Sequence, residues 1–251
     1  VISQRIKRLI LTIYYRLRGF QILISYSQQL EDIYLFNELS PPKKLLKNMH
    51  LIEVGAFDGR RYSNTMLLEN IFQLQTILIE PEPNNYKKIL KNRPKSTCLN
   101  YAISHKEELV KFICGGAVGG IFSKMSQDHK NSFSSNFVKE IEILALPLSK
   151  VLKENSVKEI YLLSIDCEGG DLDVLKSINF EEIFIHILIV EISHNKSDIK
   201  ELMLANGFYL KRNLFGNQIW VNTKSNVIPK AVKPSIPIAW KTLFLENYLK
   251  K

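Results

Sequence analysis

The chain has 251 residues, of which 45% are hydrophobic and 24% are charged, and its formal net charge is +9. This length and composition predict one globular domain with its own core. The basic residues form no stripe with interleaved aromatic side chains, which excludes a typical nucleic-acid site; an anionic glycan or a membrane surface would still suit the charge. The three cysteines include no close pair, so they predict reduced thiols in a cytoplasmic protein and exclude a zinc site.

The first 24 residues, 1–24, are basic and include no acidic side chain. Their hydrophobic stripe has helical spacing and consists of Ile2, Ile6, Leu9, Ile13, Leu17 and Phe20. The longest uncharged stretch, 19–30, is shorter than the roughly twenty residues that cross a bilayer. Two interpretations stay open: the helix packs its stripe on the domain, or it lies on an anionic membrane as a peripheral contact. The main domain is then expected at 25–224.

A glycine-containing turn follows a short apolar strand that begins at His50. It contains Glu53, Gly55, Ala56, Asp58 and Gly59, and we expect all five at a cofactor. The dinucleotide fingerprint needs a third glycine, which is missing, so the turn argues against NAD. Two flanking carboxylates disfavour a phosphate and favour a sulfonium, which predicts S-adenosylmethionine. The glycines could also serve steric needs alone.

Ser63, Asn64 and Thr65 precede a helical run that begins at Met66. Ser63 is predicted to cap this helix. The free backbone N–H groups at the helix start would suit the carboxylate of a methionine moiety. The alternative is a serine-capped helix without a ligand.

A second apolar run, 76–79, ends in Glu80 and Pro81. Glu80 is placed to accept hydrogen bonds from both hydroxyls of a ribose, and Pro81 is expected beside it. A surface carboxylate before a proline turn is the alternative. Ala102, in the next predicted strand at 97–103, is expected near the adenine, where its small size could be a steric convenience only.

The middle of the chain is predicted to form a pair of strands at 109–114 and 119–122. The glycines between them are typical of turns, because no Lys-Ser/Thr pair follows in P-loop spacing. The polar segment 126–135 is predicted to be a mobile loop near the rim of the site. A strand at 141–146 and a short helix at 148–153 follow.

Residues 161–166 predict a buried strand that ends in Asp166, and a helix is expected at 171–178. Asp166 would face the cofactor or the acceptor, and Glu168 would lie in the loop beside the methyl group. Both carboxylates are candidates for a general base. The alternative for one of the two is capping of the helix.

The strand predicted at 184–192 contains Glu191 near its end, and His194 follows it. His194 is a third candidate base, although a lone loop histidine is often simply solvated. Several carboxylates at strand ends could hold a divalent metal. Because no clear ligand triad is visible, we predict no metal site.

The last part of the domain is predicted to be a helix at 197–206 and an antiparallel hairpin of 208–214 with 218–222. The remaining residues, 225–251, are expected to form an extended arm and a docking helix. Strands that alternate with helices predict an α/β fold with a doubly wound, Rossmann-like, mostly parallel sheet of seven strands that ends in this hairpin.

Five blocks in this order resemble the FkbM-type methyltransferases. They are 27–35, 53–59 with 63–65, 79–81 with Tyr86 and Asn92-Arg93, 164–169 with 171–175, and 189–191. The chain departs from the family pattern at Gly170 and Asp171, where a small residue followed by Glu is more common. The resemblance implies a doubly wound sheet, S-adenosylmethionine as donor, and methyl transfer to an oxygen, often of a sugar.

We therefore predict an S-adenosylmethionine-dependent O-methyltransferase that acts on a hydroxyl of a glycan or related metabolite. The candidate bases are Asp166, Glu168 and His194. Two alternatives from other classes stay open. One is a non-catalytic module with the same fold that binds the cofactor or a glycan, and the other is an NAD-dependent oxidoreductase.

Overall fold

The computed structural model describes residues 25–133, 139–192, 195–214 and 216–228. The predicted helix at 1–24, most of the C-terminal arm and His194 lie outside these residues, so their roles stay predictions. No helix in the described part of the chain is long and apolar enough to cross a bilayer.

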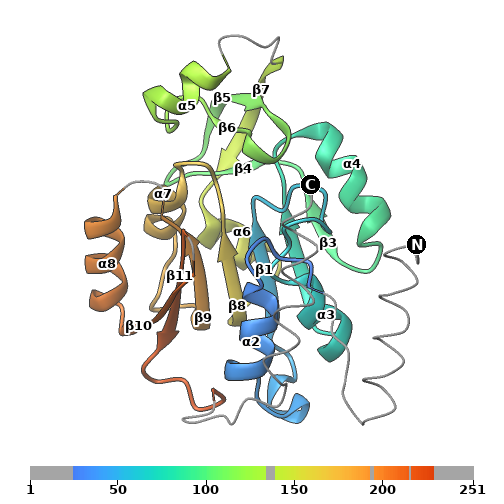
Figure 1. Cartoon of the computed structure of the whole chain (residues 1–251), viewed down its shortest axis with the longest axis vertical. Coiled ribbons are helices and arrows are strands. Elements are labelled where there is room, and N and C mark those ends of the chain that lie inside the picture. The colour runs from blue at the N-terminus through green and yellow to red at the C-terminus, as the bar shows by residue number, and fades with distance from the viewer. Residues whose placement is uncertain (1–24, 134–138, 193–194, 215, 229–251) are drawn as a thin grey trace, which may run out of the picture.

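A seven-stranded sheet forms the centre of the fold (Figure 1). Its strands are β1 (His50–Val54), β2 (Gln75–Ile79), β3 (Thr97–Leu99), β8 (Glu159–Ile165), β9 (Phe184–Glu191), β10 (Phe208–Leu214) and β11 (Asn217–Asn222). Their order is β10-β11-β9-β8-β1-β2-β3, and every adjacent pair is parallel except the two that contain β11. The predicted sheet with its antiparallel C-terminal hairpin is confirmed.

Helices cover both faces of this sheet. One face carries α2 (Glu31–Leu39), the short 3-10 helix η1 (Lys43–Leu46), α3 (Met66–Phe72) and α4 (Pro83–Asn92); the other carries α6 (Leu148–Glu154), α7 (Asp171–Lys176) and α8 (Lys196–Ala205). Successive residues of a strand point to opposite faces. Leu162 of β8 therefore belongs to the same core cluster as Leu68 of α3, whereas the next residue, Leu163, belongs to the cluster of Leu175 of α7 on the other face. Burial on both sides explains why the central strands are almost continuously apolar.

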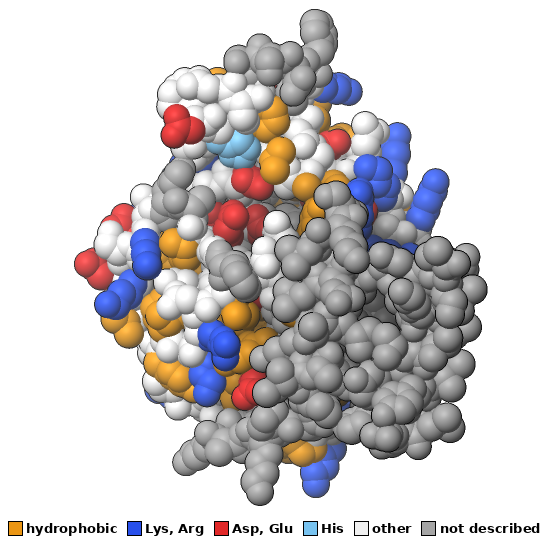
Figure 2. All heavy atoms as spheres, viewed as in Figure 1, with side chains coloured by type: hydrophobic (Ala, Val, Ile, Leu, Met, Phe, Trp, Pro, Cys, Tyr) orange, Lys and Arg blue, Asp and Glu red, His pale blue; other side chains and the backbone are white. Residues whose placement is uncertain are grey.

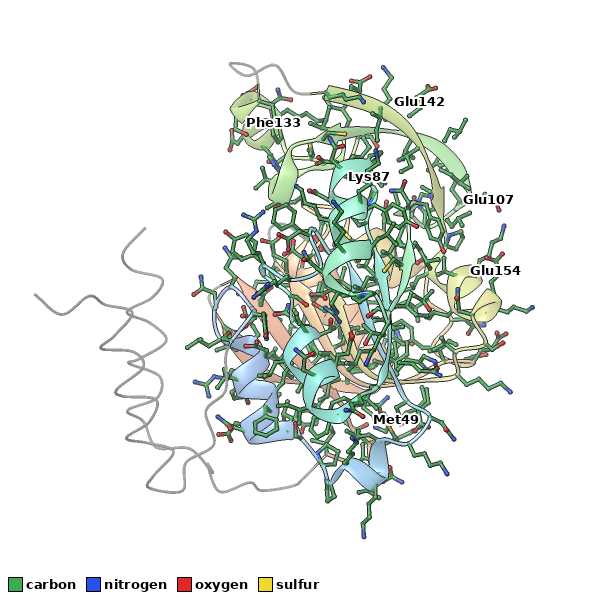
Figure 3. All side chains as sticks on the ribbon, turned by 90° about the vertical axis from the view of Figure 1, so that its right-hand side faces the viewer. Met49, Lys87, Glu107, Phe133, Glu142 and Glu154 are labelled. Atoms are coloured by element: carbon green, nitrogen blue, oxygen red, sulfur yellow. The ribbon has the colours of Figure 1, made fainter. Side chains whose placement is uncertain are left out.

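A second, four-stranded sheet lies beyond the carboxyl ends of the main strands (top of Figure 1). It consists of β4 (Ala102–Ile103), β5 (Glu108–Cys114), β6 (Gly120–Ile121) and β7 (Lys139–Leu146) in the order β4-β7-β5-β6, and the 3-10 helix η2 (Gly116–Val118) joins β5 to β6. The predicted pairing across the glycine turn is confirmed, with Phe112 opposite Ile121. Figure 3 shows Glu142 of β7 at this end of the molecule and Met49 at the opposite end.

The prediction of one strand at 97–103 was wrong in one respect. The chain leaves the main sheet after β3 and enters the second sheet as β4. Asn100 fixes this change of direction, because its side-chain amide donates to the backbone carbonyls of Glu80, at 2.8 Å, and Pro81, at 2.9 Å.

The prediction of a loop at 126–135 was also wrong, since α5 (Gln127–Ser132) lies there. The Ser126 hydroxyl caps this helix by accepting a hydrogen bond from the backbone N–H of His129 at 3.1 Å. Asp128 adds a negative charge in the first turn, where the helix dipole favours it. A polar composition was therefore compatible with a short capped helix.

Candidate active site

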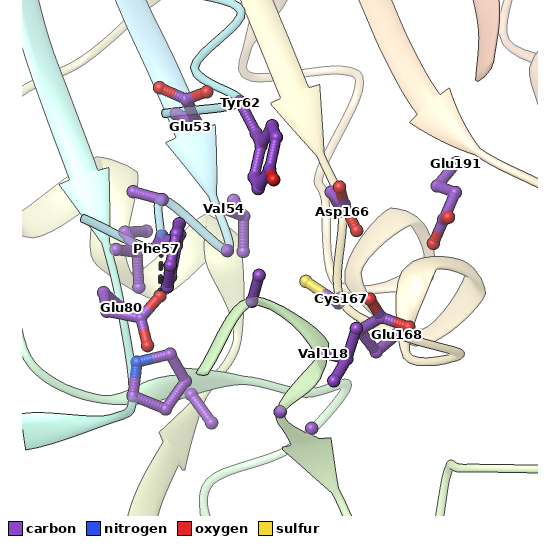
Figure 4. A pocket seen from close by; sticks show the side chains of 18 of the residues that line it. Glu53, Val54, Phe57, Tyr62, Glu80, Val118, Asp166, Cys167, Glu168 and Glu191 are labelled. Atoms are coloured by element: carbon purple, nitrogen blue, oxygen red, sulfur yellow. Dashed lines mark hydrogen bonds between the residues drawn. The ribbon is translucent and has the colours of Figure 1, made fainter. Parts of the chain in front are cut away.

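A cavity of about 260 Å³ opens where the main strands end and the second sheet begins (Figure 4). Ligands of open α/β sheets bind at this edge. Of the predicted site residues, the cavity is lined by Glu53, Gly55, Ala56, Asn64, Glu80, Pro81, Ala102, Asp166 and Glu168. Glu191, which the sequence placed at a strand end, also lines it, whereas Asp58, Gly59, Ser63 and Thr65 do not.

The turn after β1 contacts the ends of two neighbouring strands. The backbone N–H groups of Gly55 and Ala56 donate to the carbonyl of Ile79 at 3.0 and 3.1 Å. Gly55 has a φ of +81°, and a Cβ atom added there would lie 1.8 Å from the backbone oxygen of Asp166. The glycine is therefore needed for close packing of the protein itself, which was the steric alternative.

Glu80 is buried at the end of β2, with 5% of its surface exposed. Its carboxylate accepts hydrogen bonds from the backbone N–H groups of Phe57 and Glu82, both at 2.8 Å. Burial raises the pKa of Glu80 to about 8, against the lowering effect of these hydrogen bonds. Pro81 and Ala102 line the same cavity, and the adenosine contact predicted for the three residues stays a prediction.

Glu53 is held by residues that were themselves predicted to contact the cofactor. Its carboxylate accepts hydrogen bonds from the Ser63 hydroxyl at 2.8 Å, the Asn64 backbone N–H at 2.8 Å and the Thr65 hydroxyl at 2.7 Å. Burial raises the pKa of Glu53, while the positive charge of Arg93 opposes the rise. The structure thus gives Ser63 and Thr65 a supporting role behind the cavity wall.

The prediction of Ser63 as the N-cap was wrong in position, because the N-cap of α3 is Thr65; the Ser63 hydroxyl still accepts a hydrogen bond from the backbone N–H of Met66, the first residue of the helix, at 3.1 Å. Asp58 and Gly59 support the same turn. Asp58 accepts from the backbone N–H and the side chain of Arg61, both at 2.7 Å, and the Gly59 carbonyl accepts from Arg93 at 2.9 Å. These contacts fix the loop that places Glu53 and Gly55.

Three carboxylates face the opposite side of the cavity. The side chains of Asp166, Glu168 and Glu191 bring oxygen atoms within 4.8 Å of one another. Figure 2 shows acidic side chains gathered in a recess below the second sheet, with a histidine beside them. Burial raises the pKa of Glu168 to about 7, and the charges of Glu191 and Asp171 add to the rise.

Asp166 is affected in the same direction. Burial raises its pKa well above the ordinary value of a carboxyl group, with further contributions from Glu191, Asp171 and Glu168. Carboxyl groups with raised pKa values can take up a proton near neutral pH, as a general base must. Such a cluster also offers oxygen ligands of the kind that divalent cations use. Nothing else in the described residues indicates an ion, and the expectation of no metal site stays a prediction.

The turn between Asp166 and α7 is fixed by Asp171, whose carboxylate accepts from the backbone N–H of Cys167 at 2.9 Å. Burial raises the pKa of the Cys167 thiol well above its ordinary value, which disfavours the thiolate form. Capping of the helix was the alternative considered for one of Asp166 and Glu168, but the N-cap of α7 is Gly170, with no side-chain capping hydrogen bond. Asp166 and Glu168 are left facing the cavity.

Several cavity residues were not predicted from the sequence, among them Gln28, Phe57, Tyr62 and the glycine turn that contains η2. Phe57 and Tyr62 have positive φ angles of 50° and 64°, and their rings stack with centroids 6.0 Å apart. Non-glycine residues rarely adopt this conformation, and such strain often occurs at ligand sites. No pattern in the sequence predicts the positive φ angles of Phe57 and Tyr62.

The doubly wound, mostly parallel sheet with a cavity at the carboxyl ends of its strands places the chain in the Rossmann-like α/β class. Residues 53–215, more than half of the chain, match the family model of the methyltransferase FkbM domain. The chain therefore belongs to this family and is a methyltransferase. The resemblance inferred from the five blocks is confirmed, and the methyltransferase identity replaces the alternative of an NAD-dependent oxidoreductase.

Two solved structures are similar at 10% sequence identity each. A precorrin-6y C5,15-methyltransferase from Geobacter metallireducens GS-15 gives a TM-score of 0.40, with 80% of this chain and 90% of that chain covered. A putative tRNA (m1A22) methyltransferase, Sp1610 of Streptococcus pneumoniae, gives 0.33, with 91% and 80% covered. A comparison with curated proteins found no match.

Proposed function

We propose that this chain is an S-adenosylmethionine-dependent O-methyltransferase whose acceptor is a hydroxyl of a glycan or a related hydroxylated metabolite. The observation that carries the proposal is one cavity with two acidic sides. The buried carboxyl group of Glu80 lies on one side, the cluster of Asp166, Glu168 and Glu191 lies on the other, and the Gly55 turn lies between them.

The first side suits the adenosine of the cofactor. Two ribose hydroxyls are hydrogen-bond donors that the Glu80 carboxylate can accept, and they would favour its charged form. Pro81 and Ala102 offer apolar surface beside it. Glu53 and Asp166 lie on either side of Gly55, and a bound sulfonium would favour their ionised forms. When bound, S-adenosylmethionine supplies a methyl group that is activated for displacement by a nucleophilic oxygen.

The second side suits a hydroxyl acceptor. Asp166 and Glu168 can accept hydrogen bonds from an acceptor hydroxyl, orient its oxygen and take up its proton. The raised pKa of Glu168, about 7, makes this proton uptake favourable near neutral pH, and burial raises the pKa of Asp166 in the same direction. The cytoplasmic location and the membrane contact through 1–24 belong to the proposal as predictions without structural support.

Calorimetry with S-adenosylhomocysteine tests the cofactor. No binding at millimolar ligand would remove the proposal. The acceptor is tested by transfer of a radiolabelled methyl group from S-adenosylmethionine to a glycan extract. Cofactor binding without any transfer would favour the non-catalytic module instead.

A further inference from the structure

We propose that His129 of α5 is a positioning residue that holds Glu168 in place for proton uptake from the acceptor. The proposal rests on the proposed function, because it assigns Glu168 a part in methyl transfer. His129 comes from the second sheet region, which lies outside the five sequence blocks of the family resemblance.

The geometry places His129 between two parts of the cavity wall. Its Nδ1 lies 3.7 Å from a carboxylate oxygen of Glu168, and its Nε2 lies 3.0 Å from the backbone oxygen of Val118 in η2. The His129 and Glu168 side chains are only 18% and 21% exposed. The ring stacks on Phe133 with centroids 5.2 Å apart, and Ser126 anchors the backbone of His129. The ring is therefore restrained from several sides.

The Val118 contact determines which ring nitrogen carries hydrogen. A backbone carbonyl can only accept, so Nε2 must be the donor. In the neutral ring, Nδ1 then has a lone pair directed at Glu168. The contact between Nδ1 and Glu168 is attractive when a single proton is shared between them. Either Nδ1 is protonated and faces an ionised carboxylate, or the Glu168 carboxyl group is protonated and faces the lone pair of Nδ1.

In this arrangement Glu168 can take up the proton of the acceptor hydroxyl. The O–H bond of the acceptor breaks and its proton goes to Glu168, while the oxygen forms a bond to the methyl carbon and the carbon–sulfur bond of the donor breaks. The sulfonium becomes a neutral thioether, so charge and atoms balance. The lone pair of Nδ1 can then accept a hydrogen bond from the protonated Glu168.

Other acidic groups surround Glu168. Asp166, Asp171 and Glu191 repel it whenever both partners are ionised. Among the described residues, His129 is the basic side chain that lies within ion-pair distance of Glu168. Lys124, the next candidate, pairs with Asp173 instead.

The backbone reinforces this coupling. A Cβ atom on Gly169 would lie 2.7 Å from the carbonyl oxygen of Lys124, and one on Gly120 would lie 3.3 Å from the Cβ of Glu168. The turn that carries Glu168 and the segment that leads to α5 are thus in direct contact. A displacement of α5 would move the partner of Glu168.

The first experiment observes the ring nitrogens of His129 by long-range ¹H–¹⁵N NMR of the full chain. We expect the Nε2–H tautomer and a clear change of the Nδ1 shift in Glu168→Gln. His105 is the internal control, since it lies 3.6 Å from Asp173 in a similar pair that does not include Glu168. An Nδ1–H tautomer, or an Nδ1 shift of His129 that is the same in Glu168→Gln as in the unmodified protein, would overturn the proposal.

The second experiment measures methyl transfer to the glycan extract. His129→Ala should lower turnover by at least about tenfold, below the full effect of losing a base, with little change in S-adenosylhomocysteine affinity. His129→Gln can keep the donor to Val118 but provides no ring Nδ1, so it should not restore turnover. Full rescue by glutamine would reduce His129 to a structural role. His105→Gln should be active.

S-adenosylhomocysteine calorimetry on the same samples separates the two proposals. Loss of binding in the unmodified chain removes the proposed function. If S-adenosylhomocysteine binds but the His129 signals do not change in Glu168→Gln, only the positioning role of His129 is removed.

Discussion

The backbone carbonyl oxygen of Asp166 lies 1.8 Å from the position that a Cβ atom on Gly55 would occupy. The β1 turn and the end of β8 thus touch at the centre of the cavity. Any side chain at position 55 has to separate the two strand ends that carry the proposed cofactor and acceptor groups.

We therefore expect Gly55→Ala to be strongly destabilising. The left-handed backbone costs about 1–2 kcal/mol for a residue other than glycine, and overpacking adds about 1–3 kcal/mol. Gly116→Ala is a matched control, because Gly116 has a φ of +69° and nothing within 4 Å of its Cβ position. Urea unfolding should show a clearly larger loss for Gly55→Ala; equal losses would mean that the close approach is relaxed in solution.

The same contact shows what sequence reasoning could reach. The Gly55 turn and the carboxylates at the strand ends were recognisable because short apolar runs ending in acidic residues mark the edge of a parallel sheet. The reason for the glycine was not visible, since Asp166 lies more than a hundred residues further along the chain. Glycine at position 55 would be expected either for a nearby ligand or for close packing of the backbone, so the residue type alone does not distinguish the two reasons.

The second sheet could be predicted only in part, since the pairing of β5 with β6 was expected but the pairing of β4 with β7 was not, for a related reason. β4 has only two residues, and it pairs with β7 through Ala102 and Ala145. A two-residue strand has no periodicity, and its partner is distant in the chain. Consequently the approach of α5 to Glu168, which depends on this sheet, could not be predicted either.

For the cofactor, we predict that Glu80→Ala weakens S-adenosylhomocysteine binding by about 1.5–3 kcal/mol, the range for a hydrogen bond to a charged group. Calorimetry measures this directly. Glu159→Gln is a suitable control, because Glu159 contacts His186 at the opposite end of β8 and is not part of the cavity. An unchanged dissociation constant for Glu80→Ala would show that the ribose contact is misassigned.

The support of Glu53 gives a prediction about stability. Thr65→Val removes a 2.7 Å hydrogen bond to a buried carboxylate while it keeps the shape of the side chain. We expect the free energy of unfolding to fall by about 1.5–3 kcal/mol. Thr76→Val is the control, since Thr76 is also buried but donates only to the Leu74 carbonyl at 3.4 Å. Similar losses in urea unfolding for the two variants would contradict the role of Thr65.

The buried carboxyl groups predict how stability depends on pH. Burial raises the pKa values of Glu80 to about 8 and of Glu168 and Asp171 to about 7. The native state keeps protons that the unfolded chain releases near pH 4, so this stabilisation is complete at low pH and is lost as the pH rises through about 7–8.

The ligand-free protein should accordingly lose stability from these groups between about pH 5 and pH 8. Asp171→Asn and Glu168→Gln should each make the dependence shallower in urea unfolding at both pH values. A dependence as steep as in the unmodified protein would mean that these carboxyl groups are ionised throughout.

The last prediction separates the two candidate bases. Removal of a general base typically costs about a hundredfold to ten-thousandfold in rate, whereas loss of a residue that only orients the acceptor chiefly raises its Michaelis constant. We predict that Glu168→Gln lowers turnover strongly while S-adenosylhomocysteine still binds, because Glu168 takes up the proton, and that Asp166→Asn has a smaller effect. Each amide keeps the size and reach of the acid, so a large loss points to the charge. Methyl transfer to the glycan extract over a broad pH range measures both variants. If both keep full turnover, neither carboxylate is the base; His194 is then the next residue to substitute, and orientation of the acceptor alone would account for the rate if that variant is also active.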